Sequence, residues 1–205
     1  MPVVVPFGLF VALTVPFFVN DVGFILAGSA AQWLAIDYGS KALVLAVVVL
    51  SPVLRRAVVA GSQWPTNGWT TVAATAGVTV ATVGLFTWLD RSGADRATAL
   101  QVFFPIEQPW LLVVDLAAGL ALTAVVEEIV FRRLFIDTFA ARLTPMGLYF
   151  ISAALFAAIH WSNGIGTIGG AFVTGFLLMW LTRRSGSVLP AVSAHYFINL
   201  ILFWP

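Results

Sequence analysis

The chain has 205 residues, of which 60% are hydrophobic and 9% are charged, and its net charge is +1. These values lie outside the range of soluble globular domains and predict a polytopic membrane protein. The small net charge gives no sign of a nucleic-acid-binding surface, and the absence of cysteine excludes disulfides and a cysteine nucleophile.

Seven apolar segments are candidates for membrane spans, since a spanning helix needs roughly 20 mainly apolar residues. They cover residues 3–19, 41–54, 69–89, 110–131, 146–162, 164–182 and 187–204. The first has no basic residue before it and contains two prolines, so we interpret it as a membrane helix rather than a cleaved signal peptide. The stretch 22–36 is a short span, a re-entrant piece or an extension of its neighbour. We therefore expect an all-α bundle of seven or eight transmembrane helices in a single membrane domain, residues 1–205.

Arginines cluster after three of these segments and indicate the orientation of the chain. Alternating the spans places all of them on the same side of the membrane: Arg55, Arg56, Arg132, Arg133, Arg142, Arg183 and Arg184. The positive-inside rule assigns that side to the cytoplasm. We expect an integral protein of a bacterial or archaeal cell membrane.

Residues 125–135, VVEEIVFRRLF, place four charges where a membrane helix is predicted. Consecutive helical residues differ by about 100°, so Glu127 and Glu128 point to different surroundings. Glu128 and Arg132 have the i, i+4 spacing that favours an ion pair on one helix face. Glu127 has Phe131 at that position, so its partner must come from another helix.

The two histidines of the chain both lie in apolar segments. Phe156 precedes His160 by one helical turn, and Asn199 follows His195 by one turn, so each pair shares a face. Ionisable groups in a membrane cost roughly 2.5–3.5 kcal/mol each, which makes them functional candidates. A glutamate beside a histidine can remove a proton from water, and a second histidine with an asparagine can stabilise an oxyanion.

Three motifs in this order resemble those of the CAAX protease and bacteriocin-processing family, membrane glutamyl endopeptidases that include the type II CAAX prenyl proteases. The motifs are Glu127-Glu128-x-x-x-Arg132, Phe156-x-x-x-His160 and His195-x-x-x-Asn199. The resemblance covers residues 110–202, which would form the catalytic core, whereas the helices of residues 1–100 have no assigned role.

The resemblance implies that Glu127 and His160 activate water and that His195 and Asn199 stabilise the oxyanion. Glu128 and Arg132 would support the site structurally. The implied reaction is hydrolysis of a peptide bond within the membrane, without a cofactor. The implied partners are a peptide or protein substrate, either lipidated or membrane-anchored, and the lipid bilayer, with no nucleic acid. CAAX-like tails, sorting signals and bacteriocin peptides all fit this description.

Two alternatives stay open from the sequence. Glu127, His160 and His195 could instead hold zinc or iron as a two-histidine, one-carboxylate site. A proton-coupled transporter or an immunity protein could use the same residues without catalysis. In the enzymatic reading, the position of Glu127 near the arginine-rich end of its span predicts a site that opens toward the cytoplasm.

Overall fold

The computed structural model describes the chain except for residues 1–3, 64, 66–67, 96–97 and 101–103. The start of the first predicted span, residue 3, thus lies outside the described residues. The helices in chain order are α1 Phe7–Leu26, α2 Ala30–Leu50, α3 Pro52–Ala60, α4 Gly68–Ser92, α5 Pro109–Val114, η1 Asp115–Gly119, α6 Leu120–Glu128, η2 Ile129–Leu134, α7 Phe135–Phe139, α8 Pro145–Ala158, α9 Ile165–Ser185 and α10 Leu189–Phe203.

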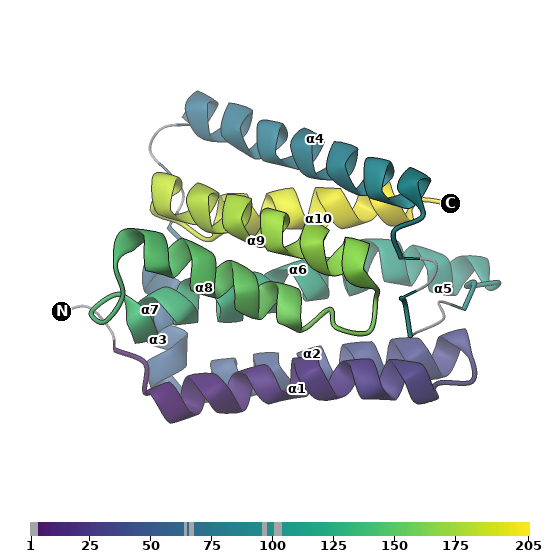
Figure 1. Cartoon of the computed structure of the whole chain (residues 1–205). Helices are drawn as coiled ribbons and strands as arrows, with labels where there is room; N and C mark the ends of the chain where they lie inside the picture. Colours follow the sequence, from purple (N-terminus) through teal and green to yellow (C-terminus); the bar gives the residue numbers. More distant parts are fainter. Residues whose placement is uncertain (1–3, 64, 66–67, 96–97, 101–103) are drawn as a thin grey trace.

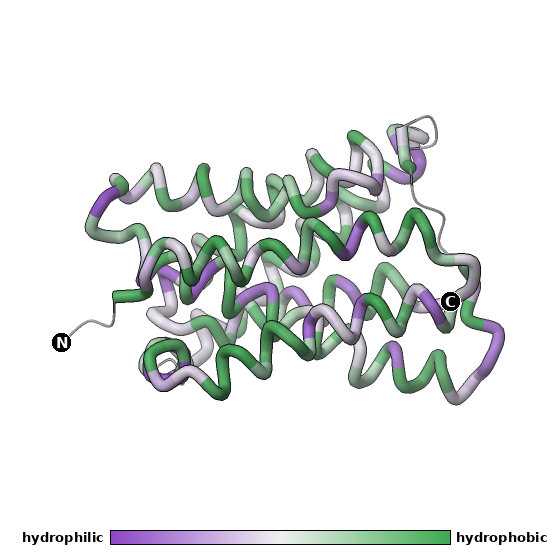
Figure 2. The backbone as a smooth tube through the Cα atoms, turned by 90° about the horizontal axis from the view of Figure 1, so that it is seen from below, coloured by the Kyte–Doolittle hydropathy of each residue, from purple (hydrophilic) through white to green (hydrophobic). Residues whose placement is uncertain are grey.

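The helices run roughly side by side and form a layered bundle (Figure 1). The hairpin of α1 and α2 lies on one side and α4 on the opposite side, with α6, α8, α9 and α10 between them. Figure 2 shows that hydrophobic residues dominate along the helices, while hydrophilic residues appear at the turns and at a few points inside the bundle. Helices of this composition must bury their few polar groups against one another, because lipid offers them no hydrogen bonds.

The first two helices decide between the alternatives for residues 22–36, in favour of extensions of the neighbouring spans. This stretch is no separate span, because α1 continues to Leu26 and α2 begins at Ala30. The break falls at the small residues between them, where the Ser29 side chain accepts a hydrogen bond from Gln32 N and caps α2. The span predicted at 41–54 is likewise the second half of α2, which ends before Pro52 starts the short helix α3.

The charged stretch lies in a continuous helical segment, Pro109–Phe139, that is longer than the predicted span 110–131. Two π-helical turns, η1 and η2, interrupt its α-helical geometry. Such turns often occur at functional sites, and η2 begins immediately after Glu128. Glu127 is 18 residues after Pro109 and 12 before Phe139, so it lies inside the segment and not close to its end.

Five described helical segments are long and apolar enough to cross a membrane, and α8 and α10 are shorter apolar helices. Together they make seven apolar helices in the described residues, which confirms the predicted all-α, polytopic membrane fold. The arginine-rich groups lie at the end of the bundle that carries α3 and α7, beside the N-terminus, while the C-terminus lies at the other end (Figure 1).

Candidate active site

Glu128 and Arg132 form a completely buried ion pair inside the bundle. Arg132 Nε lies 3.1 Å from Glu128 Oε2, and both side chains have no solvent exposure. The two groups are within ion-pair distance but are not aligned for a hydrogen bond. This contact confirms the i, i+4 pairing expected from the sequence. We call it the sealed pair.

The ring of Phe156 covers the sealed pair. The guanidinium carbon of Arg132 lies 4.3 Å from the centroid of this ring, a cation–π contact. The same ring makes edge contacts with His160 at 5.0 Å and with His195 at 5.8 Å between centroids. Phe156 therefore packs against the guanidinium and against both histidines.

His195 connects the two neighbouring carboxylates. Its Nδ1 donates a hydrogen bond to Glu128 Oε1 at 2.9 Å, and its Nε2 lies 3.8 Å from Glu127 Oε2. A carboxylate only accepts hydrogen bonds, so the proton on Nδ1 is fixed by Glu128. The sequence predicted a partner for Glu127 on another helix, but it did not predict that Glu128 would orient His195.

A cavity of about 140 Å³ brings the four predicted catalytic residues together. Its lining includes Glu127 from α6, His160 from the turn after α8, and His195 and Asn199 from α10. Glu127 is 5% exposed, and its Oε2 has no hydrogen-bond partner among the described residues. The carboxylate lies between Lys41 Nζ, 3.9 Å from Oε1, and His195 Nε2, 3.8 Å from Oε2, and makes no hydrogen bond to either.

The turn that carries His160 is held from two sides. His160 Nδ1 donates to the carbonyl oxygen of Phe156 at 2.8 Å, which leaves Nε2 as the acceptor of the neutral ring. The buried carboxylate of Asp21, on α1, accepts hydrogen bonds from Ser162 N at 3.1 Å and from Ser162 Oγ at 2.8 Å. Sequence reasoning did not identify Asp21 as a contact of this turn.

Helix α2 supplies a second group of residues that sequence reasoning missed. Lys41 forms an ion pair with Asp37 one turn earlier, and its Nζ also lies 3.9 Å from Glu127 Oε1. Tyr38 donates to Asp115 Oδ1 at 2.5 Å, so Asp115 has a specific partner inside the bundle. A Cβ at Gly119 would overlap the Tyr38 side chain, so glycine there permits the approach of α2. The sequence did contain a signal for Lys41, because Asp37 and Lys41 have the same i, i+4 spacing as Glu128 and Arg132.

The cavity extends away from the arginine-rich end of the bundle. Beyond Glu127 its lining reaches Trp33 in the first turns of α2, Asn163 in the turn between α8 and α9, and Phe203 at the end of α10. The expected opening toward the arginine-rich side thus has no support in the described residues. The expectation placed the end of the span near residue 131, whereas the helix continues to Phe139, and the side of the membrane to which the site opens stays a prediction.

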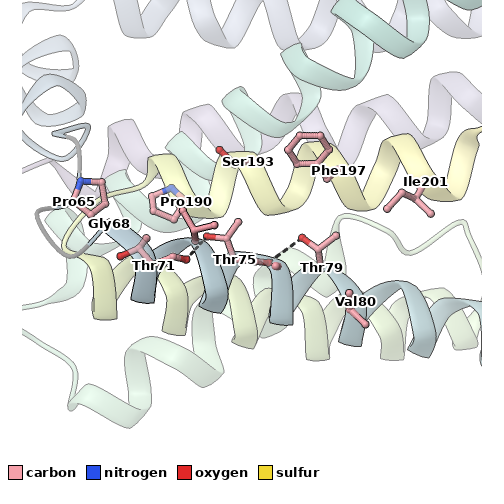
Figure 3. Close-up of a pocket in the computed structure, with 12 residues that line it drawn as sticks. Pro65, Gly68, Thr71, Thr75, Thr79, Val80, Pro190, Ser193, Phe197 and Ile201 are labelled. Carbon is pink, nitrogen blue, oxygen red and sulfur yellow. Dashed lines mark hydrogen bonds between the residues drawn. The ribbon is translucent and has the colours of Figure 1, made fainter.

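A larger groove of about 390 Å³ lies between α4 and α10 (Figure 3). It shares no lining residue with the cavity. Ser193 and Phe197 line it, and these positions lie about 200° around α10 from His195 and Asn199. Ser193 donates to the carbonyl oxygen of Leu189 and so does not face a histidine. This groove is separate from the candidate active site.

The residues proposed as metal ligands do not form a ligand set. Among the described residues, no group of three or more His, Asp or Glu side chains is arranged to hold a metal ion. Nδ1 of His160 and Nδ1 of His195 are both hydrogen-bonded to protein oxygens, which leaves Nε2 of each ring available. Metal-ligating histidines are usually oriented in this way, so zinc or iron at Glu127, His160 and His195 stays an untested alternative.

The comparisons with known proteins agree with the motifs. Neither the curated proteins nor the solved structures gave a match to the chain. Residues 109–201 match the family model described as type II CAAX prenyl endopeptidase Rce1-like. This segment contains the sealed pair and the four predicted catalytic residues. The match confirms the resemblance drawn from the three motifs over residues 109–201, which are 93 of the 205 residues of the chain.

Proposed function

We propose that the protein is an intramembrane endopeptidase that hydrolyses a peptide bond with water activated by Glu127 and His160. The observation that supports this most is that Glu127, which is 5% exposed, lines one cavity with His160, His195 and Asn199. The family match supports peptidase chemistry at the level of reaction class.

In the proposed reaction, a water molecule binds between the Glu127 carboxylate and His160 Nε2. Glu127 takes one proton from this water as the oxygen attacks the carbonyl carbon of the substrate. The carbon–oxygen bond forms, and the carbonyl oxygen becomes an oxyanion. Collapse of the tetrahedral intermediate breaks the carbon–nitrogen bond, and Glu127 returns its proton to the leaving amine. Atoms and charges balance without a metal ion.

His195 and Asn199 are the proposed donors to the oxyanion. Because Nδ1 of His195 already donates to Glu128, its Nε2 can donate only when the ring carries both protons. The carboxylate of Glu128 stabilises that imidazolium, which gives the sealed pair a role in orienting His195. The amide nitrogen of Asn199 is the second donor. Donors of this kind each contribute roughly 3–4 kcal/mol to transition-state stabilisation.

The direction of the cavity suggests how the substrate enters. We propose that a membrane-held peptide or protein reaches Glu127 from the end that carries Trp33, Asn163 and Phe203. The arginine-rich end is the cytoplasmic one by the positive-inside rule. Access then takes place from the opposite side of the membrane.

The test is a comparison of membrane peptides in cells that express wild-type protein, Glu127→Gln or Glu107→Gln. Glu107 is exposed and lies before α5, so the second variant makes the same chemical change outside the cavity. We expect peptides that depend on the wild type and on Glu107→Gln but are absent with Glu127→Gln, at equal protein levels. Identical peptides with wild type and Glu127→Gln would refute the role of Glu127 as the base.

A further inference from the structure

The only lysine of the chain is buried inside the membrane bundle. Lys41 lies in the middle of α2 and is 5% exposed. An ammonium group in such surroundings is costly unless it is paired, and intramembrane charges usually mark a function. The partners of Lys41 are therefore informative about its role.

The first partner of Lys41 is Asp37, which is itself held by α1. Lys41 Nζ is paired with Asp37 Oδ1, and Asn20 Nδ2 donates to the same oxygen at 3.0 Å. Ser40 Oγ lies 3.2 Å from Asn20 Oδ1 and donates to it. These contacts hold the ammonium between α1 and α2 independently of its contact with the C-terminal helices.

The second partner is the proposed catalytic base. Lys41 Nζ lies 3.9 Å from Glu127 Oε1, and His195 Nε2 lies 3.8 Å from the other oxygen, Oε2. The other charged or titratable groups around Glu127 are Asp21 from α1, His160 after α8, His195 from α10, and Glu128 with Arg132 on its own helix. Arg132 is held in the sealed pair. Lys41 is the single Lys or Arg in the described lining of the cavity.

We propose that Lys41 is a positioning residue for Glu127, an inference that rests on the proposed function. Its ammonium lies beside Oε1 and so orients the carboxylate in the cavity lining. The positive charge also offsets the negative charges of Asp21 and Glu128 near the base. The hairpin of α1 and α2, outside the residues matched by the family model, thereby completes the active site.

The test compares Lys41→Met, Lys41→Arg and Arg55→Met. The last variant removes the same charge from an exposed position at the arginine-rich end. The assay is cleavage of a synthetic peptide that spans the site identified in the membrane-peptide comparison. We expect Lys41→Met to lower kcat by roughly 100-fold or more with little change in KM, since general-base catalysis contributes at least that factor. Lys41→Arg keeps a cation near Oε1 and recovers most of kcat, and Arg55→Met has the wild-type rate.

A second variant and a second measurement separate positioning from folding. Asp37→Asn combined with Lys41→Met removes both charges of the buried pair, which proteins tolerate better than the loss of one partner. The double variant is expected to accumulate normally and to show the same loss of kcat. In infrared spectra without substrate, we expect Lys41→Met to gain a protonated carboxyl band that disappears when Glu127→Gln is added.

The results distinguish this inference from the proposed function. An active Glu127→Gln protein overturns the proposed function itself. An inactive Glu127→Gln protein together with a wild-type kcat in the Asp37→Asn, Lys41→Met protein overturns only the role of Lys41. Equal losses in Lys41→Arg and Lys41→Met, without the new carboxyl band, would assign Lys41 a purely structural role and also overturn the inference.

Discussion

Two adjacent glutamates on one helix have opposite surroundings. Glu128 belongs to the sealed pair, where both oxygens are taken up by Arg132 and His195 and no solvent reaches them. Glu127 lines a cavity and has only longer contacts, to Lys41 at 3.9 Å on one oxygen and to His195 at 3.8 Å on the other. The comparison teaches that the partners around a buried carboxylate, more than its sequence motif, separate a structural role from a catalytic one.

The largest effect is expected from breaking the sealed pair. Arg132→Met leaves Glu128 as an unpaired buried charge, which costs about 3–5 kcal/mol of stability. The measurement is the thermal unfolding midpoint of the purified protein, with Arg184→Met as a control at an exposed arginine.

The double variant Glu128→Leu, Arg132→Met sharpens the same comparison. Without either charge the core is expected to regain much of the lost stability. Its activity should stay low, because His195 has lost the acceptor for Nδ1. A single Arg132→Met protein that unfolds at the wild-type temperature would contradict the structural role of the pair.

A slightly smaller effect is expected from changing Asn199 in the cavity lining. It concerns the reaction rate and not the stability. Asn199→Ala removes one proposed oxyanion donor and should raise the activation barrier by about 2.7–4 kcal/mol, or roughly 10²–10³-fold in kcat. The unfolding midpoint should not change, because no hydrogen bond ties Asn199 to the described residues except the helical ones of α10. The control is Asn163→Ala, which also lines the cavity but lies at its far end. A raised KM with an unchanged kcat would show that Asn199 binds substrate only.

The smallest effect is expected from single cysteine substitutions. They test whether the cavity or the buried core is open to reagents, and from which side of the membrane. The chain has no cysteine, so single cysteines can be introduced by Asn163→Cys in the cavity lining and Ser152→Cys in the buried core. A membrane-impermeant maleimide added to intact cells is expected to label the first and not the second. Labelling of the Asn163→Cys protein only after the cells are opened would reverse the proposed direction of access.

Much of the fold could be predicted from apolar runs alone, because lipid requires long apolar helices with internally satisfied backbones. The errors in the predicted spans concern the residues at which helices begin and end. The break between α1 and α2 was marked by Ser29, a helix-capping residue, but span counting gave it no weight. The extension of the charged helix to Phe139 could not be seen from hydropathy, because Arg132 and Arg133 look like the end of a span.

The residues of the candidate site that belong to a sequence motif were predicted. Those that reach the site only through tertiary contacts were not. Glu127, His160, His195 and Asn199 meet in one cavity as expected, although their catalytic roles stay predictions. Asp21 and Lys41 belong to no motif, and each reaches the site from a helix more than 80 residues away in the sequence. Helical spacing fixes which side chains share a face, but not which face of another helix they meet.

The location of His195 and Asn199 on α10 affects when the protein can become active during synthesis. Every other element of the cavity is made earlier: α1, α2, α6 and the turn after α8 all precede α10 in the chain. Until α10 has inserted, Glu128 lacks its histidine and the two proposed oxyanion donors are absent. Under the proposed function, the nascent chain therefore cannot cleave a peptide before α10 is in place.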